Sequence, residues 1–181
     1  DHMDVMACRQ TGFAMFCSGS VQEVMDLSAV PYLSTLESSV PFINFFDGFR
    51  TSHEYHKVEE MDMEDIRPLV NPEWIKRHRE ACNKYYEAIP AIVEKHLAEI
   101  SKITGREYHL FNYYGAPDAE HIIVLMGSAT EAAREAIDFL TKQGKKVGMV
   151  AVHLYRPFSV EAIRKAIPDT VKRIAVLDRT K

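Results

Sequence analysis

The last third of the chain alternates apolar segments of strand length with amphipathic segments of helix length, and this alternation constrains the fold more than any other feature. It predicts strands at residues 122–126, 147–152 and 174–177, with helices at residues 130–142 and 160–167 between them. Consecutive strands joined by helices are typical of βαβ units, whose strands are parallel and whose crossovers are right-handed. The sequence therefore predicts an α/β fold with a parallel sheet.

A second βαβ unit is predicted near the start of the chain. Residues 12–18 form an apolar run typical of a strand covered on both faces, and residues 40–46 form another that ends in a turn. Between them, residues 20–37 have helical spacing, and Pro31 is expected to kink or restart that helix.

The middle of the chain is less regular. Weak patterns predict a short strand at residues 57–61 and a short helix at residues 63–69. Apolar residues then recur at helical spacing over residues 72–104, which predicts a long helix that Pro90 interrupts and Gly105 ends. This order of elements indicates two α/β pieces, Rossmann-like or transketolase-like, joined by a helical linker.

Composition argues against several classes of protein. Lys and Arg number 22 against 26 Asp and Glu, and the net charge of −4 gives no general attraction to nucleic acid or to an anionic membrane. No apolar run approaches the roughly 20 residues that cross a bilayer, so a soluble, cytoplasmic protein is expected. The cysteines at positions 8, 17 and 82 are too widely spaced for a disulfide framework or a metal cluster, and we interpret them as reduced core thiols.

Five segments of the chain carry a resemblance to a known family. They read RQTGFAM at residues 9–15, FFDGFRTSHE at 45–54, LFNYYGAPDAE at 110–120, HLYRPF at 153–158 and VLDRTK at 176–181. Together, and in this order, they resemble pyruvate:ferredoxin (flavodoxin) oxidoreductase. The resemblance spans nearly the whole chain, although relatives carry a longer stretch between Val70 and Asn71.

The resemblance implies three parts. Residues 1–70 correspond to the C-terminal part of the family's first domain, residues 71–104 to a helical linker, and residues 105–181 to an α/β domain similar to the transketolase C-terminal domain. Because the chain also closes on a predicted strand, it is interpreted as a fragment of a larger enzyme. The parent is implied to be a homodimer that cleaves pyruvate oxidatively to acetyl-CoA and carbon dioxide and passes electrons to ferredoxin or flavodoxin.

The resemblance implies thiamine diphosphate, Mg²⁺, [4Fe–4S] clusters and coenzyme A for the parent enzyme, and no cofactor on this chain. The family's segments that bind pyruvate, activate the thiamine and hold magnesium and the clusters lie outside it. No catalytic residue is identifiable, so the segment is interpreted as a scaffold and interface for the remaining domains. Two alternatives stay open: an oxidoreductase for another 2-oxoacid, and a free-standing small-ligand-binding module on residues 127–181.

The main candidate site is the polar segment that follows the second apolar run. It places six polar side chains just past the carboxyl end of a buried strand, where open parallel sheets bind ligands: Asp47, Arg50, Thr51, Ser52, His53 and Glu54. One interpretation is an active-site wall or interdomain loop, in which Arg50 holds an anion and His53 or Glu54 forms hydrogen bonds. The other interpretation is a capped, salt-bridged turn.

Three further motifs have mainly structural interpretations. Ser128 and Glu131 have the spacing of a capping box, which would satisfy the helix start internally. Arg156 is a candidate interface residue that pairs with a carboxylate or braces a turn, with Ser159 capping the next helix. His53 and His56 are a close histidine pair, and without a third ligand no metal site is expected there.

Overall fold

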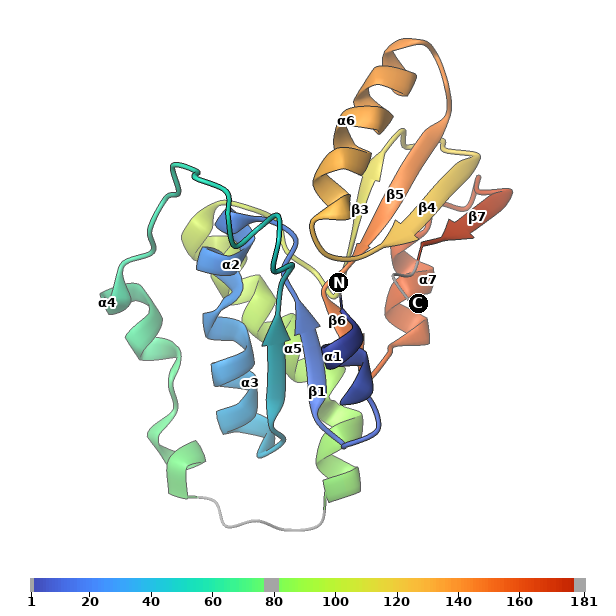
Figure 1. Ribbon diagram of the computed structural model, residues 1–181. Helices are drawn as coiled ribbons and strands as arrows, with labels where there is room; N and C mark the ends of the chain where they lie inside the picture. The colour runs from blue at the N-terminus through green and yellow to red at the C-terminus, as the bar shows by residue number, and fades with distance from the viewer. Residues whose placement is uncertain (1, 77–81, 178–181) are drawn as a thin grey trace.

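The first of the two sheets combines segments from both ends of the chain. The computed structural model describes residues 2–76 and 82–177 (Figure 1). The first sheet has the order β2-β1-β6, from β1 (Ala14–Cys17), β2 (Phe42–Phe45) and β6 (Leu154–Arg156). β1 and β2 are parallel, whereas β6 is antiparallel to β1. The predicted N-terminal βαβ unit is confirmed, and a strand from far along the sequence extends its sheet.

Two consecutive helices form the crossover between β1 and β2, α2 (Val21–Leu27) and α3 (Ala29–Ser38). The break falls at Ser28, ahead of Pro31, and Pro31 lies in the first turn of α3, where the missing N–H has no helical partner to lose. The sequence therefore predicted the restart of the helix correctly and placed it slightly too late.

The predicted long helix begins as a short 3₁₀ helix, η2 (Pro72–Lys76), and continues as α5 (Cys82–Thr104). Residues 77–81, also predicted to be helical, lie outside the described residues. The predicted interruption at Pro90 is wrong, because α5 runs through it without a break. Four apolar side chains of α5 near Pro90 are fully buried. The burial of each stabilises the fold by about 1.5–3 kcal/mol. Together they offset the roughly 3 kcal/mol that a proline inside a helix costs. They are Ile89, Val93, Leu97 and Ile100.

The second sheet has the order β3-β5-β4-β7. Its strands are β3 (Phe111–Gly115), β4 (His121–Leu125), β5 (Val147–Val152) and β7 (Arg173–Val176). β4 is parallel to β5 and to β7, as predicted, and β3 adds an antiparallel edge. The crossover helices are α6 (Ala129–Lys142) and α7 (Val160–Ala166).

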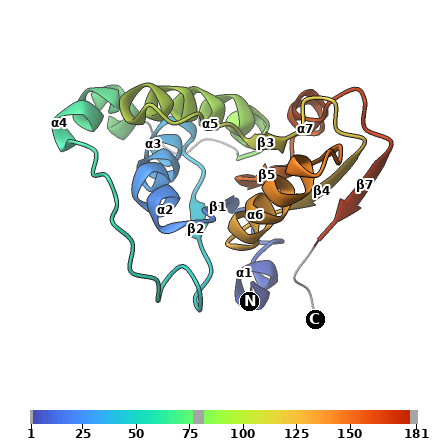
Figure 2. The same cartoon turned by 90° about the horizontal axis from the view of Figure 1, so that it is seen from above.

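Strand alternation sends neighbouring residues to opposite faces of both sheets. In the first sheet, Ala14 and Phe16 join the main core beneath α2, α3 and α5, whereas Met15 and Cys17 pack on the other face with Val5 of α1 (Met3–Ala7). In the second sheet, Leu125 and Met149 pack under Ile137 of α6, and the opposite face joins the main core with residues of α7. Figure 2 shows α5 running along α3 at one side of the molecule.

The backbone passes directly from one sheet to the other at His153. β5 and β6 are consecutive, so one stretch of backbone contributes a strand to each sheet. The N–H of Cys17 in β1 donates to the carbonyl of His153 (2.8 Å), and the N–H of His153 donates to the carbonyl of Leu110 (3.0 Å). One apolar cluster contains residues of both sheets, of α2 and of α5. The division of the chain at residues 70 and 104 stays a prediction.

The segment between β2 and α5 contains little regular structure. Besides η2, it contains α4 (Met63–Ile66) and η1 (Arg67–Leu69), which confirm the predicted short helix. The strand predicted at residues 57–61 is wrong, because these residues have no ladder partner in the described part of the chain. Side-chain contacts hold this segment instead, as described below.

Candidate functional site at the junction of the two sheets

Asp47 lies just after β2 and connects three separate segments. The residue is buried, with 2% of its surface exposed. Its Oδ2 accepts a hydrogen bond from the backbone N–H of Ser128 at 2.6 Å, and its Oδ1 lies 2.8 Å from Nε2 of His2. A single carboxylate therefore joins the loop after β2, the start of α6 and the N-terminal segment.

Glycine at position 127 permits this close approach. Its φ is +74°, in the left-handed region that side chains rarely adopt. A Cβ there would lie 3.0 Å from Oδ2 of Asp47 and 3.1 Å from Cε1 of His2. Both the backbone conformation and the available space therefore favour glycine at this position.

The capping box predicted for Ser128 and Glu131 is wrong. Ser128 has helical dihedrals (φ −62°, ψ −17°), and its side chain makes no capping hydrogen bond. An N-cap residue normally has extended dihedrals, which direct its side-chain oxygen toward the first N–H groups of the helix. The carboxylate of Asp47 takes this role from outside the helix, and Glu131 lies against Arg50 instead.

Arg50 bridges the loop after β2 and the first turn of α6. Its Nε donates to Oε1 of Glu54 at 2.9 Å, its Nη2 lies 3.4 Å from Oε2 of Glu131, and its Nη1 donates to the carbonyl of Ser128 at 3.5 Å. The hydrogen bond from Arg50 holds the pKa of Glu54 below its ordinary value, whereas burial raises the pKa of Glu131. The Arg50 side chain is 42% exposed, so it stays accessible to a further anionic group.

The other candidate residues of this loop are mainly engaged with one another. Ser52 Oγ donates to the carbonyl of Gly48, which also lies 3.0 Å from Nδ1 of His53. Nε2 of His56 lies 3.1 Å from Oε2 of Glu54. Thr51 is buried, and its hydroxyl has no hydrogen-bond partner among the described residues. The loop is therefore a salt-bridged turn, as one interpretation of the sequence proposed. Through Arg50 it also contacts a distant segment, as the interpretation of an interdomain loop requires. The functional roles of these residues stay predictions.

A cavity of about 500 Å³ opens beside this loop, between α6 and the second sheet. Asp47, Arg50 and Ser128 contribute polar groups to its lining. The remaining walls are mostly apolar: Phe49, Ile123, Leu125, Ala129, Ala132, Ala133 and Leu177. Phe49 is 86% exposed and Leu177 is 56% exposed, so large apolar side chains in the lining are also open to solvent.

A cap related to the capping box occurs at Ser20 and Glu23, which the sequence prediction missed; here the carboxylate reaches the N–H of the residue before the N-cap. Oγ of Ser20 accepts from the N–H of Glu23 at 3.2 Å, and Oε2 of Glu23 accepts from the N–H of Gly19 at 2.8 Å. Ser20 has the extended dihedrals of an N-cap residue, φ −138° and ψ 166°. The same Ser-x-x-Glu spacing was visible in the sequence and was recognised only at residues 128–131.

Glu23 also faces a buried histidine from the other end of the chain. Nε2 of His153 lies 3.4 Å from Oε2 of Glu23, and Nδ1 of His153 lies 2.8 Å from the carbonyl of His109. Burial alone would raise the pKa of Glu23 and lower that of His153. Their mutual attraction and hydrogen bond reverse both effects, so the pKa of Glu23 is lowered and that of His153 is raised. The arrangement favours the charged forms of both groups, a carboxylate and an imidazolium that attract each other.

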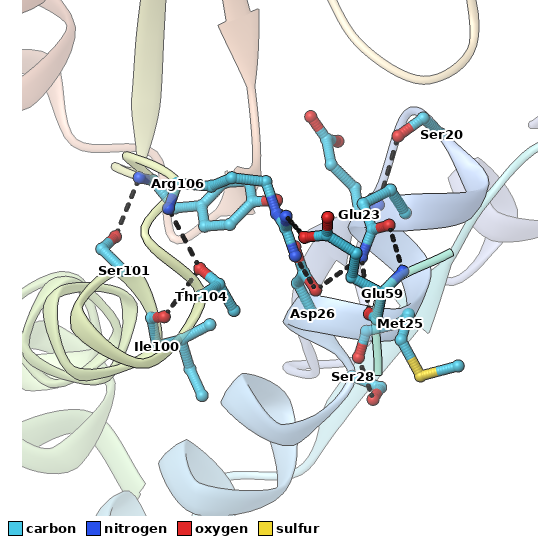
Figure 3. A network of polar contacts seen from close by, with 12 residues as sticks. Ser20, Glu23, Met25, Asp26, Ser28, Glu59, Ile100, Ser101, Thr104 and Arg106 are labelled. Carbon is cyan, nitrogen blue, oxygen red and sulfur yellow. Dashed lines mark hydrogen bonds and ion pairs between the residues drawn. The ribbon is translucent and has the colours of Figure 1, made fainter. Parts of the chain in front are cut away.

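A second buried carboxylate, Asp26, holds the segment after the candidate loop in place (Figure 3). Arg106 donates to both oxygens of Asp26, at 2.6 and 3.0 Å, and the hydroxyl of Tyr108 donates at 2.6 Å. Arg106 also reaches Oε2 of Glu59 at 2.7 Å, and Gln22 makes two hydrogen bonds with the backbone of Glu59. These contacts replace the ladder of the strand predicted at residues 57–61.

Arg156 lies in β6, opposite Met15 of β1, and its role at an interface stays a prediction. The prediction for its neighbour Ser159 is confirmed, because Oγ of Ser159 accepts from the N–H of Ala162 at the start of α7. Cys17 is a free, buried thiol whose pKa is raised by burial and by the charges of Asp47 and Glu23. Cys8 is also free but only partly buried, so its assignment to the core is wrong.

Within residues 2–76 and 82–177, no three His, Cys, Asp or Glu side chains are grouped so that they could hold a metal ion. No helix in this part of the chain combines the length and the apolarity that a membrane crossing requires.

Comparison with known proteins gives consistent results. Residues 1–127 match the family described as pyruvate flavodoxin/ferredoxin oxidoreductase, thiamine diphosphate-binding, and residues 119–181 match pyruvate:ferredoxin oxidoreductase core domain II. A pyruvate-flavodoxin oxidoreductase of Enterobacter agglomerans and a pyruvate:ferredoxin oxidoreductase of Moorella thermoacetica are each 50% identical over 206 residues. Each alignment covers 100% of this chain and 18% of the relative. The chain therefore spans less than a fifth of the length of these relatives.

A solved structure supports the fold independently. The 2-oxoglutarate:ferredoxin oxidoreductase of Magnetococcus marinus aligns with a TM-score of 0.52, covering 90% of this chain and 34% of that one, at 15% sequence identity. At this identity the similarity shows the mixed α/β fold alone. The matched residues of the first family model cover well over half of the sequence. The chain therefore belongs to the pyruvate flavodoxin/ferredoxin oxidoreductase family.

Proposed function

We propose that this chain is a segment of an enzyme that oxidises pyruvate in the presence of coenzyme A. In this reaction pyruvate loses carbon dioxide, its acetyl group becomes bonded to the thiol sulfur of coenzyme A, and an electron pair passes to ferredoxin or flavodoxin. The observation that carries the proposal is the 50% identity, along the whole chain, to enzymes named for pyruvate.

Two features of the described residues support the proposal that thiamine diphosphate and Mg²⁺ bind elsewhere in the parent enzyme. Within these residues, no three His, Cys, Asp or Glu side chains are grouped as metal ligands. A diphosphate is commonly held by the free N–H groups of a helix N-terminus, but at α6 the N–H of Ser128 already donates to the buried carboxylate of Asp47. We therefore assign thiamine diphosphate, Mg²⁺, coenzyme A and the iron–sulfur clusters to the remaining parts of the parent enzyme.

We assign this segment the role of a scaffold and interface. The loop that contains Asp47, Arg50, Thr51, Ser52, His53 and Glu54 borders an open cavity whose lining includes exposed apolar side chains. Such a surface suits an adjoining domain, with Arg50 available to an anionic group on that domain or on a ligand. Arg156 is a second candidate for such a contact. We further propose that the parent enzyme is a cytoplasmic homodimer.

Steady-state assays of the intact enzyme test this proposal. With thiamine diphosphate, Mg²⁺ and coenzyme A present, pyruvate should reduce ferredoxin or flavodoxin and yield acetyl-CoA and carbon dioxide in equal amounts. 2-Oxoglutarate and an aromatic 2-oxoacid serve as comparison substrates. A kcat/KM for either of these above that for pyruvate would contradict the proposal and favour an oxidoreductase for another 2-oxoacid.

A further inference from the structure

The chain just before α2 lies directly against the start of α6, although the two helices belong to different sheets. Gly19 precedes α2, and a Cβ on it would lie only 2.7 Å from Oγ1 of Thr130 and 2.8 Å from the carbonyl oxygen of Gly127. No side chain fits between the two helix starts. The backbone at this junction is therefore packed as closely as glycine allows.

Two helix N-termini close to each other place like partial charges side by side, which is unfavourable unless negative groups lie nearby. The first N–H groups of each helix have no helical partner, and a helix N-terminus carries a partial positive charge. Before α2, the N–H of Gly19 donates to Oε2 of Glu23 at 2.8 Å. At α6, the N–H of Ser128 donates to Oδ2 of Asp47 at 2.6 Å. Each carboxylate thus accepts one N–H at the junction, and its negative charge offsets the partial positive charge of the nearby helix start.

Each carboxylate also has a buried histidine from a distant segment. His2 contacts Asp47, and His153, which connects the two sheets, contacts Glu23. The side chains of His2 and Asp47 are each 3% exposed, and those of His153 and Glu23 are 4% and 16% exposed. The carbonyl of His109 can only accept a hydrogen bond, so Nδ1 of His153 must be protonated and donate to it. This hydrogen bond orients the ring so that Nε2 faces Glu23.

The loop with Arg50 is attached at this same junction. Asp47 binds the N–H of Ser128, and Arg50 donates to the carbonyl of that residue. Any movement of Asp47 relative to α6 therefore displaces the base of the loop and changes the position of the guanidinium.

We infer that Asp47 and Glu23 are positioning residues, which dock the second sheet on the first and thereby fix Arg50 at the start of α6. The expected effect on pyruvate turnover rests on the proposed function. The contact between the two sheets is a property of this segment, and amide hydrogen exchange measures it without any assay of activity.

A double-mutant cycle in the intact enzyme tests the effect on turnover. Asp47→Asn keeps an oxygen that accepts from Ser128 but removes the charge, and it should lower kcat/KM for pyruvate about tenfold, or about 1.4 kcal/mol. In the background of Arg50→Ala the same substitution should cost less than twofold, because Asp47 acts through Arg50. The control Asp118→Asn alters a surface carboxylate paired with Lys146 and should leave kcat/KM unchanged.

Amide hydrogen exchange tests the docking without relying on activity. Glu23→Gln should speed amide exchange at least tenfold at residues 128–131, at the start of α6, which packs on the second sheet. The control Glu161→Gln changes an exposed carboxylate and should leave exchange at these residues unchanged. This measurement also covers the case in which Asp47→Asn fails to fold. Unchanged exchange in Glu23→Gln, or effects of Asp47 and Arg50 on kcat/KM that simply multiply, would overturn the inference. An enzyme that does not turn over pyruvate would contradict the proposed function and leave the exchange result to decide the docking.

Discussion

Arg50 is the candidate residue whose environment most directly allows a functional role. If it holds an anionic group or an adjoining domain, Arg50→Ala in the intact enzyme should lower kcat/KM at least tenfold, about 1.4 kcal/mol, with little change in thermal stability. Little stability is expected to be lost because its ion pairs with Glu54 and Glu131 are partly exposed, and such pairs contribute about 0–1 kcal/mol.

Arg50→Lys is the informative companion variant. A guanidinium that makes several directed hydrogen bonds is not replaced by an ammonium group, so Arg50→Lys should resemble Arg50→Ala. Normal kinetics in both variants would reduce the loop to a structural turn.

The ion pair of Glu23 and His153 should give the fold a distinct pH dependence. A carboxyl whose pKa is lowered on folding contributes stability above its ordinary value of 4.5 and loses it as the pH falls through the folded pKa. An imidazole whose pKa is raised contributes stability below its ordinary value of 6.5 and loses it as the pH rises through the folded pKa. The contribution of the pair should therefore be largest between about pH 4.5 and 6.5 and fall on both sides.

This dependence is measured as the difference in the free energy of unfolding between the chain and its Glu23→Gln, His153→Asn double variant. Charged or titratable groups that face the pair stay the same in both proteins and largely cancel: Arg134, Glu131, Arg106, Glu107, Tyr108, Cys17 and Asp47. A pH-independent difference would mean that the two groups do not form an ion pair.

Among the elements, α5 shows where sequence patterns were sufficient and where they were not. The spacing of Ile89, Val93, Leu97 and Ile100 predicted the helix, because residues three and four apart share one face. It could not identify α3 as the partner, since helical periodicity describes one face and not what covers it. Pro90 misled the prediction because the tertiary burial of these side chains was not visible in the sequence.

Leu97→Ala tests whether α5 is part of the core rather than an independent linker. Leu97 is fully buried, so the variant should lower the free energy of unfolding of the 181-residue chain by about 2–5 kcal/mol in urea denaturation. Lys102→Ala on the exposed face of the same helix should change it by less than about 0.5 kcal/mol. Similar small values for both would indicate that α5 contributes little to folding.

At the scale of the whole molecule, the sequence predicted β1 and β2 of the first sheet and β4, β5 and β7 of the second, with their crossover helices. It predicted neither β6 nor the junction between the sheets. Residues 2, 47, 128 and 153 are distant in sequence, and no local pattern indicates that His2 and Ser128 meet at Asp47. The antiparallel pairing of β6 with β1 was missed for the same reason. The candidate loop itself was found because a polar segment that follows a predicted strand is a local feature of the sequence. The expectation that this strand is buried was wrong, because β2 lies at the edge of its sheet and only Phe45 in it is buried.

By itself, this segment is expected neither to bind thiamine diphosphate nor to decarboxylate pyruvate. A thiamine diphosphate site needs groups that hold the diphosphate and its metal ion, and the described residues provide no metal-ligand cluster and an α6 start that Asp47 already caps. Isothermal titration of the 181-residue chain with thiamine diphosphate and Mg²⁺ should therefore show no saturable heat, and the chain should not decarboxylate pyruvate. The intact enzyme, titrated in the same buffer, provides the positive control. A stoichiometric, magnesium-dependent binding heat for the isolated chain would show that its residues hold the cofactor, and the scaffold role would then have to be abandoned.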